Sequence, residues 1–154
     1  MTGKIAEKLK TLGVTLPELA APVANYVPFT ISGNTLYISG QLPGAGPALV
    51  KGTLGKDMTV EQGRDAARLC AISILAQARA ALKGDLDRVT RCLRLGGFVA
   101  STPDFTDHPK VVNGASDLIV EVLGDAGRHA RAAVGVAALP LGAAVEVDAI
   151  FEIR

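Results

Sequence analysis

The 154 residues of this chain carry a net charge of +1, with 49% hydrophobic and only 4% aromatic residues, and their number is that of a single domain spanning residues 1–154. Scattered positive charges and few aromatic side chains argue against binding to nucleic acid. The N-terminus lacks the apolar core of a signal peptide, and no apolar run approaches the roughly 20 residues that span a bilayer, so we expect a cytoplasmic protein without membrane contact.

The first third of the chain predicts a short helix, a loop and a hairpin. Apolar residues at helical spacing predict an amphipathic helix over residues 4–12, within an N-terminal extension that covers residues 1–24. The proline-rich stretch that follows predicts a loop. Extended runs on both sides of Gly33-Asn34 predict a β-hairpin. The Gly- and Pro-rich segment after the hairpin predicts another loop, with one brief strand at residues 48–50.

Two longer helices are predicted in the middle of the chain. Thr59 stands where it can cap a helix over residues 60–83. The centre of this helix is apolar nearly all round, so we expect it to lie across a sheet and to touch another element as well. A second helix is predicted from Thr106 or Asp107 to about Leu123.

Three further strands are predicted, one at residues 88–101 and two in the last part of the chain. Their apolar faces consist of Val89, Leu93, Leu95 and Val99 in the first strand, Val134 and Val136 in the second, and Val145, Val147, Phe151 and Ile153 in the third. The pair Gly96-Gly97 indicates a bulge or a close approach of another backbone. We expect the last two strands to form a hairpin through residues 139–142.

The order of these elements, β-β-(β)-α-β-α-β-β, predicts an α+β fold in which two helices pack on one face of a mixed sheet. No remaining element is large enough to cover the other face of that sheet. Together with the 49% hydrophobic content, this uncovered face predicts that the protein associates with copies of itself.

Arg131 and Glu146 become cross-strand neighbours if the last two strands form a hairpin. Residues directly opposite each other in an antiparallel pair share a face of the sheet. The apolar residues of one strand must therefore stand opposite the apolar residues of the other. The register that centres the turn on Ala138-Leu139 sets Arg131 opposite Glu146, with both side chains pointing away from the core.

Two interpretations of this pair are open. It can be an exposed cross-strand salt bridge, worth about 0–1 kcal/mol. Alternatively, Arg131 binds a carboxylate with its planar guanidinium, and Glu146 orients or deprotonates a water beside it. The small residues around the arginine leave the space that a pocket needs, which favours the second interpretation. These small residues are Ala130, Ala132, Ala133 and Gly135.

Several motifs in this chain resemble those of the RidA/YjgF family, also described as endoribonuclease L-PSP-like proteins. They are YISGQLP at residues 37–43, LDRV at 86–89, PDF at 103–105, HARAAV at 129–134 and LPLGAAVEV at 139–147. The likeness covers residues 25–154. It implies a chorismate-mutase-like fold in a homotrimer, in which the sheets form a central barrel, the helices lie outside and the sites lie between subunits.

The resemblance also implies a site that binds a small carboxylate-bearing substrate. Arg131 takes the place of the arginine that grips the substrate carboxylate, and Glu146 that of the glutamate that positions the attacking water. Tyr26 falls where the family has a tyrosine lining the pocket. Ser39 and Gly40 fall where backbone and hydroxyl groups contact the ligand.

Three departures from the family pattern mark a distinct branch. Ala133 stands where the family often has a cysteine, which removes a thiol but keeps the backbone carbonyl that holds water. Asn113 is the nearest candidate for the pocket asparagine of the family, although the spacings around it differ. The stretch HPKVVNGASD at residues 108–117 is the third departure.

The activity that the resemblance implies is hydrolytic deamination of reactive enamines and imines, such as 2-aminoacrylate, to 2-oxo acids and ammonia. This reaction requires no metal or other cofactor, and no His/Cys cluster in the chain has metal-ligand spacing. Cys70 and Cys92 are expected to pack as small hydrophobic groups. His129 lies on the Arg131 side of its strand and is a weaker candidate for the site.

Two other functions are considered. The first is a non-catalytic protein of the same fold that binds a 2-oxo acid or a similar metabolite. The second, an RNA-cleaving protein, fits poorly with a near-neutral charge and few aromatic residues.

Overall fold

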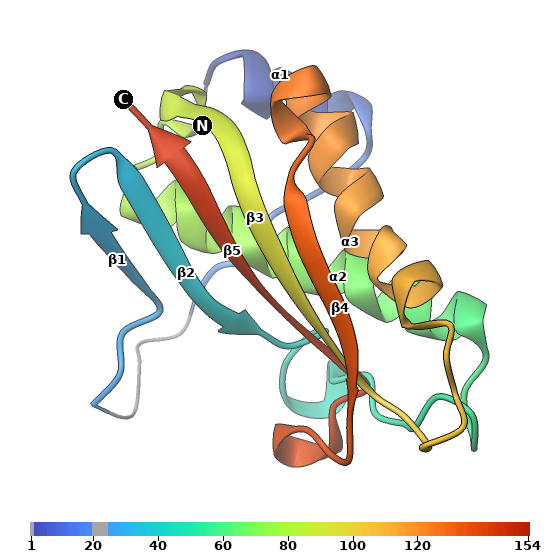
Figure 1. Cartoon of the computed structure of the whole chain (residues 1–154). Coiled ribbons are helices and arrows are strands. Elements are labelled where there is room, and N and C mark those ends of the chain that lie inside the picture. Colours follow the sequence, from blue (N-terminus) through green and yellow to red (C-terminus); the bar gives the residue numbers. More distant parts are fainter. Residues whose placement is uncertain (1, 20–24) are drawn as a thin grey trace.

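The computed structural model describes residues 2–19 and 25–154, and within them a five-stranded sheet lies against three α-helices (Figure 1). The strand order in the sheet is β1-β2-β5-β3-β4. The elements are α1 (Lys4–Thr11), β1 (Phe29–Ser32), β2 (Thr35–Gln41), α2 (Val60–Ala81), β3 (Val89–Ala100), α3 (His108–Leu123), β4 (Ala130–Val136) and β5 (Val145–Ile153). The predicted α+β class and mixed sheet are confirmed, and α1 joins the two longer helices. The predicted loop before β1 lies partly outside the described residues.

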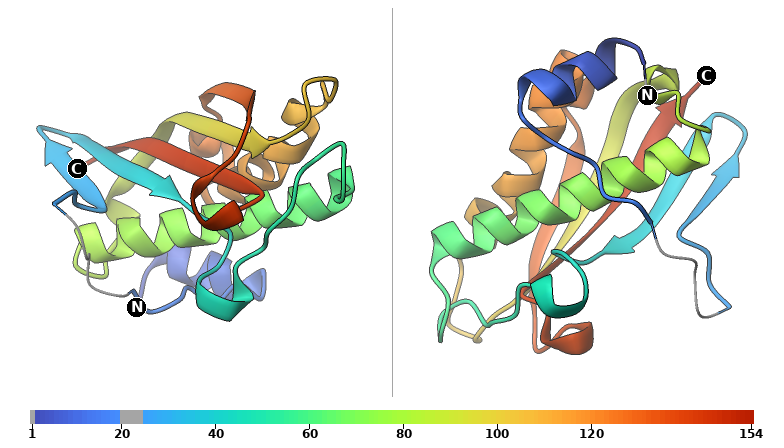
Figure 2. Two further views of the ribbon diagram at one scale, coloured as in Figure 1. Left: turned by 90° about the horizontal axis from the view of Figure 1, so that it is seen from below. Right: turned by 180° about the vertical axis from the view of Figure 1, so that it is seen from behind.

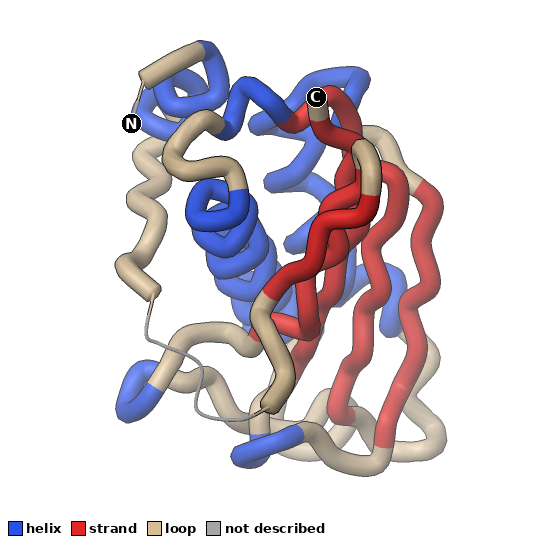
Figure 3. The backbone as a smooth tube through the Cα atoms, turned by 90° about the vertical axis from the view of Figure 1, so that its left-hand side faces the viewer, coloured by secondary structure: helices blue, strands red, loops and turns tan. Residues whose placement is uncertain are grey.

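The helices lie on one face of the sheet. Seen from behind, α2 crosses the strands, and α3 runs beside it (Figure 2). Viewed along the sheet, the strands stand on one side and the helices on the other (Figure 3). The opposite face of the sheet, toward the viewer in Figure 1, is not covered by any element among the described residues, and Tyr37 and Val134 on it are 44% and 45% exposed. No helix in the described part of the chain has the length and apolar character needed to cross a membrane.

The capping of α2 agrees with the prediction. The Thr59 hydroxyl accepts a hydrogen bond from the Gln62 N–H at 3.1 Å, and the Gln62 side chain accepts one from the Thr59 N–H at 2.9 Å. This reciprocal pair satisfies two backbone donors that the first turn of a helix leaves free. It therefore fixes the residue at which α2 begins.

The start of α1 is capped by a residue far along the chain. The Asp87 carboxylate accepts hydrogen bonds from the backbone N–H groups of Lys4 at 2.8 Å and Ile5 at 2.9 Å. Asp87 belongs to the turn just before β3. Gly3 has a φ of 109°, and a Cβ there would collide with the Asp87 side chain. A glycine is needed because the carboxylate approaches the backbone so closely.

The predicted hairpin between the last two strands is wrong. β4 pairs in parallel with β3, where Arg131 is the partner of Leu95, and β5 runs antiparallel between β2 and β3. Glu146 is the partner of Phe98 on β3, so β3 separates it from Arg131. Consequently, Arg131 and Glu146 are not cross-strand neighbours, and neither of the two sequence-based interpretations of them as an adjacent pair holds within one chain.

The physical reason is the helix between β3 and β4. Two neighbouring strands joined by a helix form a β-α-β unit, which returns the chain in the same direction and produces parallel pairing. β5 alternates buried and half-buried residues along its whole length, as a central strand does. By contrast, Val134 in β4 is 45% exposed, and Val136 is only half-buried. The prediction that these two valines belong to the core is therefore also wrong, because both lie on the uncovered face of the sheet, where Val134 is the partner of Phe98.

The pairing places Arg131 and Glu146 on opposite faces of the sheet. Leu95, the partner of Arg131, is fully buried beneath the helices. Phe98, the partner of Glu146, is three residues further along β3 and therefore points to the uncovered face. Arg131 thus shares the helix-covered face, and Glu146 lies on the uncovered one.

Three smaller predictions also need correction or explanation. Residues Gly46–Ala48 form a short 3-10 helix, and no strand begins at residue 48. The register of β3 shifts between Cys92 and Arg94, so Cys92 is buried and Leu93 is not. The register shift lies before Gly96-Gly97, and what approaches Gly97 is a side chain and not another backbone: a Cβ there would be 2.6 Å from Val112 Cγ1.

Candidate functional site

Arg131 lies on the edge strand β4, and its side chain reaches across to α3. Its Nη1 donates to Oδ1 of Asn113 at 2.8 Å and to Oγ of Ser116 at 3.1 Å. Asn113 and Ser116 are three residues apart on α3 and therefore project from the same face of that helix. All three side chains are half-buried. The helix thereby holds the arginine in place before any ligand arrives.

These two bonds leave a defined part of the guanidinium available. A guanidinium has five N–H groups in one plane, and Nη1 supplies two of them. Both are used by Asn113 and Ser116, so the fork formed by Nε and Nη2 is left over. Among the described residues, Arg131 makes no ion pair with an acidic side chain. The Nε/Nη2 fork matches the two oxygens of a carboxylate.

Glu146 belongs to a second group of residues, on the uncovered face. Its carboxyl group lies directly over Gly40 of β2: a Cβ on Gly40 would be 2.8 Å from Cδ and 2.9 Å from Oε2 of Glu146. The pKa of Glu146 is raised, first by burial of the carboxyl group and then by the negative charge of Asp148. A carboxylate with a raised pKa accepts a proton more readily, which suits a residue that activates water.

Ser39 lies beside Gly40, where the register between β2 and β5 is interrupted between Ile38 and Gln41. The Ser39 hydroxyl donates to the carbonyl oxygen of Val27 at 2.8 Å, and its N–H donates to the carbonyl of Pro28 at 2.9 Å. Since the hydroxyl proton is engaged, the lone pairs of Oγ remain to accept from a ligand. Ser39, Gly40 and Glu146 thus form one group, separate from Arg131 and Asn113.

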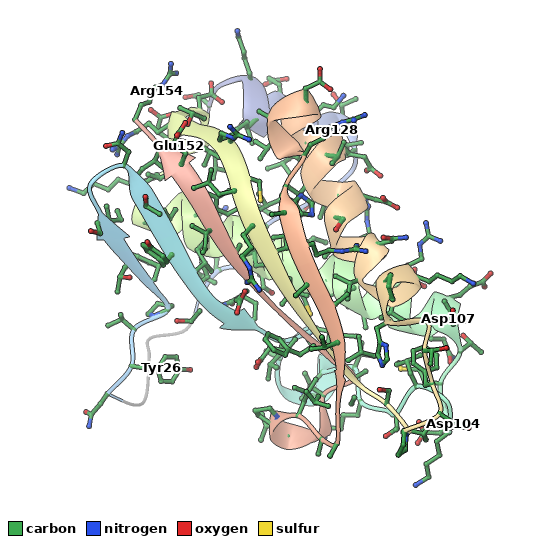
Figure 4. The ribbon with its side chains drawn as sticks, viewed as in Figure 1. Tyr26, Asp104, Asp107, Arg128, Glu152 and Arg154 are labelled. Atoms are coloured by element: carbon green, nitrogen blue, oxygen red, sulfur yellow. The ribbon has the colours of Figure 1, made fainter. Side chains whose placement is uncertain are left out.

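The remaining two predicted site residues lie in different places. Ala133 is half-buried on β4, two residues after Arg131 and on the same face. Tyr26 is 64% exposed in the loop before β1, on the side of the molecule away from β4 (Figure 4). In a single chain, the structure therefore brings Arg131, Asn113 and Ala133 together, and Tyr26 does not join them.

Ser116 is a site residue that sequence reasoning missed. The signal that was available is its helical spacing of three from Asn113. His129 is a weaker candidate from the sequence, yet its Nε2 lies 2.9 Å from Ser116 Oγ. Both residues therefore connect to Arg131.

The two cysteines behave as predicted, being fully buried in the core. Burial raises the pKa of the Cys70 thiol, with a smaller contribution from Glu146, and burial raises the pKa of Cys92 to about 12. Both thiols stay protonated at neutral pH and are poor nucleophiles. The described residues contain no group of three or more His, Cys, Asp or Glu side chains placed to hold a metal ion.

Known proteins resemble this one over nearly the whole chain. Residues 6–153 match the family model described as "YjgF/chorismate mutase-like, putative endoribonuclease". Protein TCP17 from Trypanosoma cruzi is 53% identical over 156 residues, which cover 99% of this chain and 96% of TCP17.

Solved structures also resemble this chain over most of its length. The crystal structure of Atu1372, a protein with unknown function from Agrobacterium tumefaciens, is 56% identical with a TM-score of 0.90, covering 98% of this chain and 94% of that one. The structure of RidA from the Antarctic bacterium Psychrobacter sp. PAMC 21119 is 30% identical with a TM-score of 0.56, covering 86% of this chain and 92% of that one. The backbone of this chain is therefore more similar to that of Atu1372 than to that of RidA.

Proposed function

The chain belongs to the YjgF/chorismate mutase-like family, together with RidA, and we propose that it hydrolyses small enamines and imines of 2-amino acids to 2-oxo acids and ammonia. One observation carries this proposal. The Nε/Nη2 fork of Arg131 faces no acidic side chain among the described residues, while Nη1 is fixed by Asn113 and Ser116. A positive charge held in this way suits the carboxylate of a small acid.

The proposed reaction needs a held substrate and a placed water. An enamine first gains a proton on carbon and loses one from nitrogen, which gives the imine. Arg131 binds the carboxylate of this imine, and Glu146 accepts a proton from water as the water oxygen bonds to the imine carbon. Glu146 passes this proton to the imine nitrogen, which gives the carbinolamine. The hydroxyl proton of the carbinolamine then moves to nitrogen through Glu146, the C–N bond breaks to release ammonia, and the carbonyl of the 2-oxo acid forms. Each turnover consumes one water and releases one ammonia, so electrons balance without a redox partner.

The positions of Arg131 and Glu146 favour a site made by two subunits. They lie on opposite faces of the sheet, so the pair from one chain does not face a single small substrate. We therefore place Arg131, Asn113 and Ala133 of one subunit opposite Tyr26, Ser39, Gly40 and Glu146 of a neighbour in a homotrimer. Burial of the uncovered sheet face, with Tyr37 and Val134, would supply the apolar contact for this assembly.

The test is release of a 2-oxo acid from an imine generated in the assay. An amino-acid dehydratase supplies 2-iminobutyrate, and the formation of 2-oxobutyrate is followed with and without the purified protein. The protein should accelerate release, and Arg131→Ala should abolish the acceleration. Arg128→Ala is the matched control, because Arg128 is 80% exposed on the surface and near in sequence (Figure 4). Absence of acceleration with imines derived from several amino acids would refute the proposal.

A second function, binding of a 2-oxo acid without turnover, is favoured by one observation. A single chain carries the carboxylate anchor, Arg131 with Asn113, but has Glu146 on the other face of its sheet. A branch of the family that had lost the subunit arrangement would keep binding and lose hydrolysis. Tight binding of 2-oxobutyrate, with no acceleration in the imine assay, would support this alternative.

A further inference from the structure

His129 continues the contacts of Arg131 into a chain of three hydrogen bonds. Arg131 Nη1 lies 3.1 Å from Ser116 Oγ, Ser116 Oγ lies 2.9 Å from His129 Nε2, and His129 Nδ1 lies 2.6 Å from the carbonyl oxygen of Gly127. We propose that His129 is a positioning residue, which acts through Ser116 to fix the guanidinium of Arg131 for a carboxylate ligand. This inference rests on the proposed function of Arg131 and adds one residue, His129, to it.

The groups at the two ends of this series of hydrogen bonds, the Arg131 guanidinium and the Gly127 carbonyl, decide the direction of each bond. The Gly127 carbonyl can only accept, so Nδ1 of His129 donates to it, and in this tautomer Nε2 is an acceptor. The Ser116 hydroxyl therefore donates its proton to Nε2. The guanidinium of Arg131 can only donate, and it donates to the oxygen of Ser116. In this tautomer every donor of the three contacts meets an acceptor.

Without His129, the Ser116 hydroxyl has other partners. A serine in the middle of a helix commonly turns its hydroxyl to the backbone carbonyl four residues earlier. In that orientation its lone pairs no longer point reliably at Arg131. The imidazole removes this freedom, because it gives the hydroxyl proton a fixed acceptor on the β4 side. His129 therefore sets Ser116 as the acceptor that Arg131 needs.

Fixing Arg131 in advance strengthens binding because a long side chain loses rotational freedom when it holds a ligand. Ordering one such side chain during binding weakens affinity by roughly twofold to tenfold. The contacts with Asn113 and Ser116 order the arginine before the ligand arrives. Loss of the His129 contact should therefore weaken carboxylate binding within that range and leave the chemical step little changed.

The chain offers a matched control for substitution of His129. His108 is also half-buried, and its Nε2 lies 3.1 Å from the hydroxyl of Ser101, at the other end of the contact between β4 and α3. It makes no hydrogen bond to Arg131. His129→Leu removes the acceptor, His129→Gln restores an acceptor oxygen near the position of Nε2, and His108→Leu removes an equivalent Ser–His contact elsewhere.

The first experiment observes Arg131 in the ligand-free protein by nitrogen-15 NMR. The Nε–H signal of Arg131, assigned by its loss in Arg131→Lys, should show a rigid side chain in the wild type and a mobile one in His129→Leu. His129→Gln and His108→Leu should keep it rigid. A rigid signal in His129→Leu would overturn the inference, whatever the protein binds or catalyses. Failure of the proposed function would appear separately, as no imine hydrolysis and no ligand binding by the wild type.

The second experiment uses the full-length protein and 2-oxobutyrate as the probe in calorimetric titrations. His129→Leu should raise Kd, and KM in the imine assay, by about twofold to tenfold without a matching fall in kcat. In a Ser116→Ala background, the same substitution should have no further effect, because the contact it acts through is gone. An equal rise in Kd on His129→Leu in the wild-type and Ser116→Ala proteins would overturn the proposed role of His129.

Discussion

Asn113 of α3 accepts a 2.8 Å hydrogen bond from Arg131 of β4, and this bond joins the helix to the edge strand of the sheet. The acceptor is an amide oxygen, which carries no charge. It therefore orients the guanidinium and leaves its positive charge uncompensated. A carboxylate at the same position would hold the arginine equally well but would neutralise it. The choice of a neutral partner keeps Arg131 ready for an anionic ligand.

The first prediction concerns Asn113→Asp, which differs from the wild type by little more than a charge. The new carboxylate should pair with Arg131 and compete with the ligand, so Kd for 2-oxobutyrate should rise by roughly tenfold or more. The free energy of unfolding should not fall, because the new ion pair is well placed. Asn34→Asp, on the exposed β1–β2 turn, adds the same charge far from Arg131 and should leave Kd unchanged. Unaltered binding by Asn113→Asp would contradict the role given to the neutral amide.

The second prediction concerns Gly40, which lies under the Glu146 carboxyl group. In Gly40→Ala, the new Cβ would be 2.8 Å from Cδ of Glu146, so the carboxyl group must move. The end of a glutamate side chain moves easily, and the melting temperature should therefore change little. Turnover in the imine assay should fall at least about tenfold if Glu146 positions the water. Gly33→Ala has no heavy atom within 4 Å of its new Cβ and serves as the comparison for turnover, although its φ of 58° makes that substitution strained.

The third prediction concerns the stability of Glu146→Gln. The folded-state pKa of Glu146 is raised by burial and by Asp148, so the folded protein binds this proton more tightly than the unfolded chain does. Proton binding at Glu146 therefore contributes fully to the free energy of unfolding below the ordinary pKa of 4.5. This contribution is lost as the pH rises through the higher folded-state pKa. The ionised carboxylate therefore lowers stability at pH 7.

Glu146→Gln should accordingly unfold at higher denaturant concentration than the wild type at pH 7, and the difference should shrink as the pH falls below about 4. It should also lose turnover, because an amide does not take a proton from water. Glu18→Gln, whose side chain is 98% exposed, should change neither property. A variant less stable than the wild type at pH 7 would contradict the prediction, and would show that contacts in the assembled protein stabilise the ionised carboxylate.

The helices and strands are predictable from sequence because each has a local signal. The capping box of Thr59 and Gln62 marks the start of α2, and Gly33-Asn34 marks the β1–β2 turn. These signals depend on neighbouring residues only, so they can be read without knowing the fold. The observed bounds of α2 and β2 accordingly lie close to the predicted ones.

Strand pairing and the composition of the site depend on residues far apart and were harder to predict. Arg131 and Glu146 would be cross-strand neighbours only if β4 and β5 were adjacent, but sequence order does not determine adjacency in a mixed sheet. The helix between β3 and β4 was the available evidence for parallel pairing. Arg131 could be identified from a motif, whereas the contact of Ser116 with Arg131 depends on how α3 lies against β4, and its spacing from Asn113 does not reveal that.

The fourth prediction concerns the Asp87 cap of α1. The pKa of Asp87 is lowered by the backbone N–H groups of Ile5 and Lys4, so the ionised carboxylate stabilises the fold above its ordinary pKa of 3.8. Asp87→Ala should lower the free energy of unfolding by about 1 kcal/mol at pH 7. The loss should disappear as the pH falls through the lowered folded-state pKa. Asp125→Ala, at a fully exposed residue, should have little effect in the same urea titrations.

The fifth prediction tests whether two subunits build one site. Arg131→Ala and Glu146→Gln should each be inactive alone, because every site then lacks one group. When the two chains are unfolded together in equal amounts and refolded, some sites combine an intact Arg131 from one chain with an intact Glu146 from its neighbour. Random assembly makes about one site in four complete, so activity should return to roughly a quarter of the wild-type value. If both groups came from the same chain, no mixed site would be complete. Refolded mixtures that remain inactive, alongside wild-type protein that regains activity, would therefore contradict the shared site.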